Sequence, residues 1–193
     1  MFIASSDDKE LIVDILSQSI GEEKCINYNI PQDKKRAERI RYLIDYSFEV
    51  SRQFGEVYIS DDRKACAIVL YPQQKKGMFS TFWLDVKLVI RTLGISGTLK
   101  SLKSGARAQK DWPADNVAYL WYIGVYPKDQ QQGVGSKLLK QIITDADKDN
   151  YVVCLETSTR KNLSWYERFG FQIYHQIELE FSLFFLKRIF SAS

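Results

Sequence analysis

A glycine-containing turn behind an apolar segment is the part of this sequence best suited to chemistry. It follows the strand-like segment 117–125, opens a helical pattern, and consists of Gln130, Gln131, Gln132, Gly133, Val134, Gly135 and Ser136. Backbone N–H groups in the first turn of a helix have no intrahelical partner, and the helix dipole adds positive potential there. The turn therefore predicts a binding site for a phosphate or pyrophosphate.

A candidate proton donor comes shortly after this turn. Tyr166 follows Asn162 by four residues, so both side chains would project from the same face of a helix. A tyrosine hydroxyl with its ordinary pKa of about 10 stays protonated at neutral pH. An anion-binding turn beside such a donor is the layout of a transferase that uses acyl-CoA. A tyrosine that only packs in the core beside Trp165 and Phe169 is the alternative.

Two other nucleotide-binding motifs contain similar glycines, and both fail on their spacing. A dinucleotide-binding motif requires glycine at position 138, which is Leu138, and a P-loop requires a Gly-Lys-Ser/Thr run that is absent. A plain strand-to-helix turn remains the alternative for Gly133 and Gly135.

The whole pattern resembles the GNAT family of N-acetyltransferases. The family motif of Gln or Arg, two residues, Gly, one residue, Gly or Ala is matched by Gln130, Gly133 and Gly135. A later family signature is matched by Asn162, Tyr166, Gly170 and Phe171. Within the family, residues 155–171 are most similar to puromycin N-acetyltransferase and its relatives, and the likeness extends to residues 56–70.

The resemblance implies a role for each matched residue. Main-chain amides from Gln130 through Ser136 would hold the pyrophosphate of acetyl-CoA, and Ile123 and Val125 would give main-chain hydrogen bonds to its pantetheine arm. Asn162 would contact the same arm, and Tyr166 would donate a proton to the departing thiolate. A CoA thiol has a pKa near ~8.5, so protonating its anion as the amide forms lowers the barrier.

The base that deprotonates the amine is not where many relatives place it. They have a glutamate on the central strand, whereas residues 119–122 of this chain contain none. Glu156, just after an apolar strand pattern, is the carboxylate candidate. Its alternative is a structural role, capping the next segment or pairing with Arg160. His175, the single histidine, and a water chain to solvent are further candidates.

Two aromatic residues on the central strand are candidates for the acceptor pocket. Tyr119 and Trp121 lie upstream of the predicted acetyl position on the same strand. Aromatic side chains also carry the largest apolar area in a small domain, so packing in the core is the alternative for both.

Composition limits the class of protein. The chain has 193 residues, a net charge of +3 and 45% hydrophobic residues, which is typical of one globular domain and gives no argument for nucleic acid. Cys25, Cys66 and Cys154 lack metal-ligand spacing, so no metal is predicted, and Cys66 and Cys154, which lie in apolar strand patterns, are expected to be buried reduced thiols. No signal peptide or membrane-spanning run is predicted, which favours a cytoplasmic protein.

Hydrophobic periodicity gives the expected elements. Helices are predicted at residues 8–19, 34–54 and 135–148, and a further helix holds Asn162 and Tyr166 and ends at Gly170 and Phe171. Strands are predicted at 57–60, 65–70, 117–125, 152–155, 171–179 and 181–188. Gly55 is placed to end the second helix. The order predicts an α+β fold, a GNAT-like mixed, mostly antiparallel central sheet flanked by helices, in one domain of residues 1–193.

A basic segment interrupts this pattern. Residues 75–110 contain eight Lys or Arg residues and one acid, and about 79–110 are interpreted as an inserted helical segment. A solvated basic face is the simpler interpretation; contact with a membrane surface or steering of an anionic ligand is the alternative.

The predicted function is therefore acetyl transfer from acetyl-CoA to a primary amine of a small molecule, by direct attack in a ternary complex. A non-catalytic acyl-CoA-binding module and a protein or peptide N-acetyltransferase are the alternatives. The identity of the acceptor and the oligomeric state, including a homodimer, are left open by the sequence.

Overall fold

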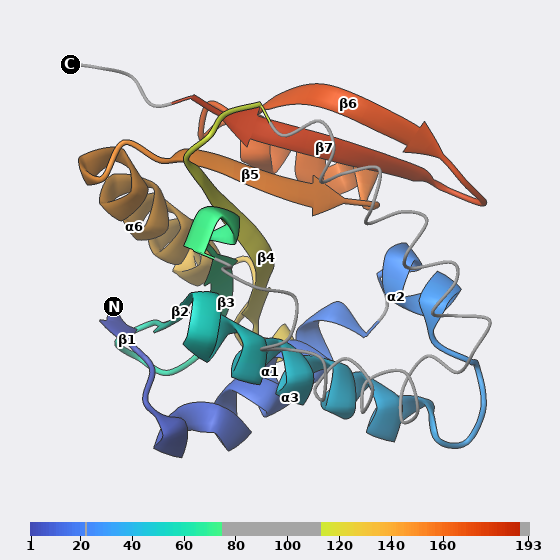
Figure 1. The fold of residues 1–193 in the computed structure, drawn as a ribbon. Coiled ribbons are helices and arrows are strands. Elements are labelled where there is room, and N and C mark those ends of the chain that lie inside the picture. The colour runs from blue at the N-terminus through green and yellow to red at the C-terminus, as the bar shows by residue number, and fades with distance from the viewer. Residues whose placement is uncertain (22, 75–112, 190–193) are drawn as a thin grey trace.

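A mixed seven-stranded sheet forms the centre of the protein (Figure 1). The computed structural model describes residues 1–21, 23–74 and 113–189, and the predicted helical insertion at about 79–110 lies outside them. The strand order is β1-β2-β3-β4-β5-β7-β6, and the parallel neighbours are β4 and β5. The strands are β1 Phe2–Ile3, β2 Gly55–Ile59, β3 Ala65–Leu70, β4 Val117–Val125, β5 Val152–Thr157, β6 Gln172–Glu178 and β7 Ser182–Arg188. The predicted mostly antiparallel α+β sheet is thus confirmed.

Helices cover both faces of the sheet. They are α1 Lys9–Ile20, α2 Lys24–Asn29, α3 Arg36–Phe54, α6 Val134–Lys148 and α7 Leu163–Glu167. Helices α1 and α3 lie together on one face, and α6 lies on the other (Figure 1). The sequence patterns located the long helices to within two residues at each end but missed β1 and α2, which are too short to show periodicity. Among the described helices, none combines the length and apolarity that crossing a membrane requires.

Strand β4 contributes to the core on both faces. Ala118 and Leu120 pack with α6, whereas Trp121 and Tyr122 lie beside the cluster formed with α1 and α3. The pairing between β3 and β4 shifts by one residue at Trp121, because Ile68 opposes Tyr122 and Val69 opposes Leu120. Such a bulge inverts the alternation of side chains beyond it. Tyr119 and Tyr122 therefore lie on the face of α1 and α3.

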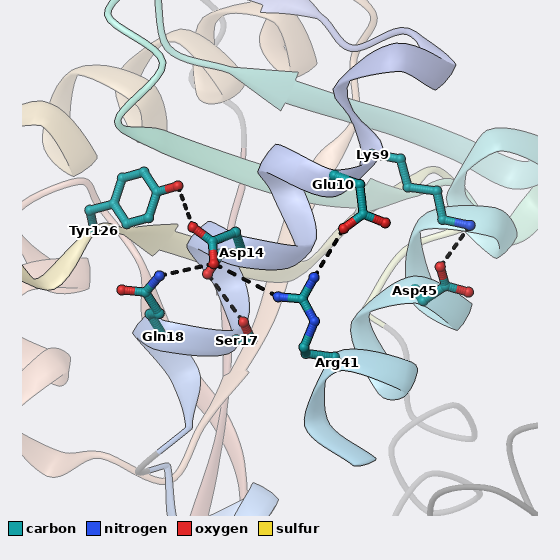
Figure 2. Close-up of polar contacts among 8 residues, drawn as sticks. All are labelled: Lys9, Glu10, Asp14, Ser17, Gln18, Arg41, Asp45 and Tyr126. Atoms are coloured by element: carbon teal, nitrogen blue, oxygen red, sulfur yellow. Dashed lines mark hydrogen bonds and ion pairs between the residues drawn. The ribbon is translucent and has the colours of Figure 1, made fainter. Parts of the chain in front are cut away.

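A polar network ties α1 to α3 and to the end of β4 (Figure 2). Tyr126, which follows β4, donates its hydroxyl to Asp14 Oδ2 of α1 at 2.7 Å. This hydrogen bond is the largest contribution to a lowered pKa of Asp14. Arg41 of α3 donates to Glu10 Oε2 at 3.0 Å, and Lys9 Nζ lies 2.7 Å from Asp45 Oδ1. These contacts join α1 to α3 and to the residue that follows β4.

Gly55 ends α3, as the sequence predicted, but it does so in an extended conformation and not in the left-handed one that a capping glycine often adopts. Helix α3 ends at Phe54, but Gly55 is extended, with φ −172° and ψ −156°, and it begins β2. A Cβ atom built on Gly55 would lie 2.0 Å from the Val69 carbonyl oxygen of β3. Glycine is needed here because two backbones approach closely, not because of a positive φ.

We therefore expect Gly55→Ala to destabilise the sheet. Forcing an extra methyl group into this contact should lower the free energy of unfolding by about 1–3 kcal/mol, measured by urea denaturation. Gly133→Ala is the comparison variant, because it adds the backbone strain of a positive φ, about 1 kcal/mol, but no steric clash, since an added Cβ there meets nothing within 4 Å. A smaller loss in Gly55→Ala than in this comparison variant would contradict the steric account.

Candidate active site

The candidate site lies where β4 and β5 separate. Their parallel pairing runs from Val117 opposite Val152 to Leu120 opposite Leu155, and the two strands then diverge (Figure 1). On the other side of β4, the Tyr126 N–H donates to the Lys64 carbonyl oxygen of the turn before β3. Residues at alternating positions of a strand direct their main-chain groups to opposite neighbours. Beyond the bulge, the main chain at positions 123 and 125 therefore faces the gap left by β5.

Ile123 and Val125 were predicted to hold the pantetheine arm, and their placement at the gap suits that role. Val125 already has partners, since its N–H donates to Ser19 Oγ and its carbonyl accepts from Gln130 Nε2, both at 3.3 Å. An incoming ligand would therefore replace or share these hydrogen bonds at Val125. The assignment of both residues to pantetheine stays a prediction.

The turn after β4 has the form of an anion-binding turn. Gln131 and Gly133 both have positive φ, 61° and 81°, and α6 begins at Val134 without a side-chain cap and without an acid in its first turn. The first amide that bonds back into the turn is that of Lys137, to the Gly133 carbonyl oxygen at 2.9 Å. The amides of Val134, Gly135 and Ser136, at the start of α6, therefore have no acceptor within the helix and can bind an anion. These residues fit the pyrophosphate of an acyl-CoA.

The two glycines of this turn are required for different reasons. A Cβ on Gly133 would meet nothing within 4 Å, so its positive φ, rather than space, selects glycine. A Cβ on Gly135 would lie 3.1 Å from Val125 Cγ2, so close packing on β4 selects glycine there. Ser136 Oγ accepts a hydrogen bond of 2.9 Å from Trp165 Nε1, which joins the start of α6 to α7.

We expect Gly133→Val to weaken the binding of acetyl-CoA. A β-branched residue strongly disfavours positive φ, so the turn would change shape and its amides would no longer converge. Isothermal titration calorimetry measures the effect. Gly170→Val is the matched control, because Gly170 also has a positive φ, 83°, but lies after α7, outside the turn. Equal affinity in folded Gly133→Val and wild type would remove the anion-binding assignment.

Tyr166 lies on α7 with its ring in the core. Its side chain is 6% exposed and packs against Trp165 and Phe171, with ring centroids 4.7 and 5.7 Å away. Its hydroxyl has no hydrogen-bond partner within the part of the chain that the structure describes. Burial, and then the charge of Glu23, raise the pKa of Tyr166 above its usual value. The hydroxyl is therefore protonated at neutral pH and free to donate.

Asn162 precedes α7 rather than lying inside it. It is the last residue of the 3-10 turn Arg160–Asn162 and forms the N-terminal boundary of α7. Asn162 and Tyr166 therefore do not belong to one regular helix, although both lie in the same short segment after β5. Contact of Asn162 with the CoA arm stays a prediction.

Glu156 on β5 has the environment of a general base. Its Oε1 accepts a hydrogen bond of 3.0 Å from the hydroxyl of Tyr119 on β4. Burial raises the pKa of Glu156 to about 7, and the Tyr119 hydrogen bond opposes this rise. The suggested pairing with Arg160 is absent, because Arg160 donates to Ser182 Oγ at 3.3 Å and lies over the Phe184 ring. A carboxyl group with a pKa near the working pH can both accept and release a proton.

The other aromatic and histidine candidates have different surroundings. Trp121 stacks on Tyr122 with ring centroids 5.3 Å apart and meets Tyr46 of α3 edge-on at 6.2 Å. Trp121 is thus held among α1 and α3, and its place in an acceptor pocket stays a prediction. His175 lies on β6, an edge strand of the sheet, and packs on Phe185 at 5.4 Å. The sheet order places β7 between this histidine and β5.

The sequence patterns missed Glu23, which the structure places at the end of β5. Glu23 Oε2 accepts hydrogen bonds from the hydroxyls of Thr159 and Ser158, the latter at 3.4 Å. The Cys25 N–H donates to Ser158 Oγ at 3.3 Å, so the start of α2 lies against the segment after β5. The charges of Glu23 and Glu156 add to burial in raising the pKa of the Cys25 thiol to about 11. The thiol is therefore protonated, and both carboxylates lie near it.

The region that contains these residues is similar to known acetyltransferases. Residues 94–173 match the family model described as an acetyltransferase (GNAT) domain. An uncharacterized N-acetyltransferase of Schizosaccharomyces pombe is 35% identical over 78 residues. This match covers 40% of the present chain and 30% of the yeast protein, so the chain spans less than a third of that relative.

Solved structures share the fold over nearly the whole chain. A Corynebacterium glutamicum protein described as histone acetyltransferase HPA2 and related acetyltransferase has a TM-score of 0.75 at 18% identity, covering 100% of this chain and 96% of that one. The C-terminal condensation domain of Ebony, in complex with beta-alanyl-dopamine, has a TM-score of 0.73 at 6% identity and 97% coverage of both chains. Arylalkylamine N-acetyltransferase 2 of Aedes aegypti reaches 0.64 at 14% identity and 98% coverage of both.

The fold and the matched region define a class of protein. At these identities the solved structures establish a shared fold, which is that of GNAT proteins. Residues 94–173, which match the GNAT acetyltransferase domain model, lie within this shared fold. Helix α6, with its anion-binding turn, β5 with Glu156, and α7 with Tyr166 all lie within the matched residues.

Proposed function

We propose that this protein is an N-acetyltransferase that moves an acetyl group from acetyl-CoA to a primary amine of a small molecule. The observation that carries the proposal is the placement of a buried carboxyl group, Glu156 on β5, and a phenol without a partner among the described residues, Tyr166 on α7, on elements that flank the gap between β4 and β5. Glu156 has its pKa raised to about 7, and Tyr166 is kept protonated by an even higher pKa. A base and an acid on elements that flank the β4–β5 gap are what aminolysis of a thioester requires.

The chemistry divides between these two residues. The nitrogen of the amine attacks the thioester carbonyl carbon, a C–N bond forms, and the C–S bond breaks. The ammonium of a free amine, with a pKa of ~10.4, must lose a proton first, and Glu156 accepts it directly or through a water molecule. The thiolate that departs takes a proton from the Tyr166 hydroxyl, and the second proton that the nitrogen loses as the amide forms returns to the Tyr166 oxygen, directly or through water. No covalent enzyme intermediate is needed, so both substrates bind together.

The donor would be held by the turn after β4. Amides from Gln130 through Ser136 would hold the pyrophosphate, with Ile123, Val125 and Asn162 along the pantetheine arm. When bound, acetyl-CoA supplies the activated acyl group. The amides at the start of α6 have no side-chain cap, and the first turn of α6 contains no acidic residue that would repel a phosphate. Both features support this placement of the donor.

A small-molecule acceptor is supported by the aromatic surroundings of Glu156 and by two of the similar folds. Tyr119 contacts Glu156, and Tyr122 lies on the same face of the sheet. The Aedes aegypti protein is named for arylalkylamines, and the Ebony domain was solved with beta-alanyl-dopamine. The Corynebacterium glutamicum protein is described as a histone acetyltransferase, so a peptide acceptor is the competing proposal.

Steady-state release of CoA thiol tests the function. The panel comprises aliphatic amines, arylalkylamines, puromycin and a lysine-containing peptide, each with acetyl-CoA. Puromycin is included because residues 155–171 resemble its acetyltransferase. Amine-dependent release, with initial-rate plots that intersect, is expected for direct transfer in a ternary complex. Binding of acetyl-CoA without amine-dependent release would instead identify a non-catalytic acyl-CoA-binding module.

We place the reaction in the cytoplasm. Cys25, Cys66 and Cys154 are free thiols in the structure, and Cys66 and Cys154 are buried as the sequence pattern predicted. Free cysteines are typical of a reducing compartment.

A further inference from the structure

Two carboxylates from distant parts of the sequence lie on the same side of the candidate site. Glu156 is next to last in β5, whereas Glu23 precedes α2. The hydroxyls of Ser158 and Thr159, the two residues after β5, both donate to the same oxygen of Glu23. Glu23 is therefore fixed at the end of the strand that carries Glu156.

Among the residues that the structure describes, no lysine or arginine neutralises the negative charge of this pair. Among the described residues, the partners of Glu23 and Glu156 are hydroxyl groups, and neither carboxylate forms an ion pair with a lysine or arginine. Both hydroxyl hydrogen bonds to Glu23 go to Oε2, which leaves Oε1 available as an acceptor. Partly buried carboxylates without a cation are costly, so the arrangement favours a ligand that brings one.

The hydroxyl of Tyr166 indicates that Glu23 faces the reaction space rather than the outer surface. Tyr166 is 6% exposed and has no hydrogen-bond partner among the described residues. Burial is the main cause of the raised pKa of Tyr166, and the charge of Glu23 adds to it, which agrees with a position of Glu23 on the same side of the site. A hydroxyl without a hydrogen-bond partner and a carboxylate without a cation on the same side of the site favour a polar, cationic ligand there.

We propose that Glu23 binds a second cationic group of the acceptor, so that the preferred substrate is an aliphatic diamine. Glu156 cannot perform this task, because it must take a proton from the reacting nitrogen and so cannot also hold a fixed ammonium group. Glu23 has no part in that proton transfer. One amino group of the diamine would react beside Glu156, and the other would pair with Glu23 Oε1. This inference rests on the proposed function and adds the substrate class.

A matched pair of acceptors tests the inference. The ratio of kcat/KM for putrescine to that for n-butylamine is measured with saturating acetyl-CoA, because the two amines differ only in the second ammonium. The wild-type ratio should be about tenfold or more, well beyond the statistical advantage of two amino groups. Glu23→Gln should reduce the ratio about tenfold, and Glu23→Asp, which keeps the charge, should retain most of it. Glu10→Gln, which removes an exposed carboxylate that pairs with Arg41, should leave the ratio unchanged.

The possible outcomes distinguish a failure of the role of Glu23 from a failure of the proposed acetyltransferase function. Equal use of both amines by the wild type, or an unchanged ratio in Glu23→Gln, would overturn the role of Glu23 while leaving the acetyltransferase function in place. Turnover of n-butylamine shows that the function holds whatever the ratio. Absence of acetylation with every amine would overturn the proposed function, and the diamine proposal with it.

Discussion

Replacing Tyr166 with phenylalanine should lower kcat by about 100- to 10,000-fold, the usual range for loss of a general acid. Tyr166→Phe keeps the ring that packs on Trp165 and Phe171 and deletes only the hydroxyl. Because that hydroxyl has no partner among the described residues, its removal should not lower stability. The affinity for acetyl-CoA, measured by calorimetry, should stay close to that of the wild type.

Tyr58→Phe is the matched control for this substitution. Tyr58 is also buried, at 4% exposed, but its hydroxyl donates to Glu56 on β2, away from the β4–β5 gap. Tyr58→Phe should therefore lower the melting temperature and leave kcat near the wild-type value. Near-normal turnover in Tyr166→Phe would reduce Tyr166 to a packing residue.

Replacing Glu156 with glutamine should change both the rate and its dependence on pH. The carboxyl group must be deprotonated to accept a proton, so the wild-type kcat/KM should rise with pH through the pKa of about 7. Glu156→Gln should lower kcat/KM by about 100-fold or more and remove the inflection near this pKa. Glu178→Gln, an exposed glutamate on β6, is the control that should keep the wild-type profile. An inflection that survives in Glu156→Gln would assign the base to another group.

The same substitution should raise stability at alkaline pH. The pKa of Glu156 is raised from 4.5 to about 7 on folding, so between these values the unfolded chain releases a proton that the folded protein retains. Stability from this group is therefore present at low pH and lost as pH rises through 7. Glutamine still accepts the Tyr119 hydrogen bond without the buried charge. Glu156→Gln should melt above the wild type at pH 8 and near it at pH 4, and a lower melting temperature at both would indicate a structural role instead.

The features that depend on short-range spacing were predictable from the sequence. The turn at 130–136 and strand β4 were located correctly, because a strand, a glycine turn and a helix follow one another without a gap. Positions that depend on a distant partner were not. Gly55 follows a helix, as a capping glycine does, and only the position of Val69 on the neighbouring strand shows that its role is to permit close approach.

The acceptor side of the site shows the same limit. Glu23 lies 136 residues from Thr159, to which it is hydrogen bonded, and no local pattern marks that contact. The one hint in the sequence is an acidic pair, Glu22 and Glu23, directly after the helical pattern that contains Leu16. Glu156 could be chosen as a candidate base from its place after an apolar strand. Its raised pKa depends on burial and on Tyr119, which only the folded chain brings to it.

The most direct test of the account follows the acetyl group itself. The purified chain is incubated with acetyl-CoA that carries an isotopic label in the acetyl group and with the amine that gave the fastest CoA release. Mass spectrometry then identifies the product. The account predicts one labelled acetyl group on the amine nitrogen for each CoA released, with product formation strongly reduced in Tyr166→Phe and Glu156→Gln. Binding of acetyl-CoA with no labelled amine, or equal product from the wild type and both variants, would contradict it.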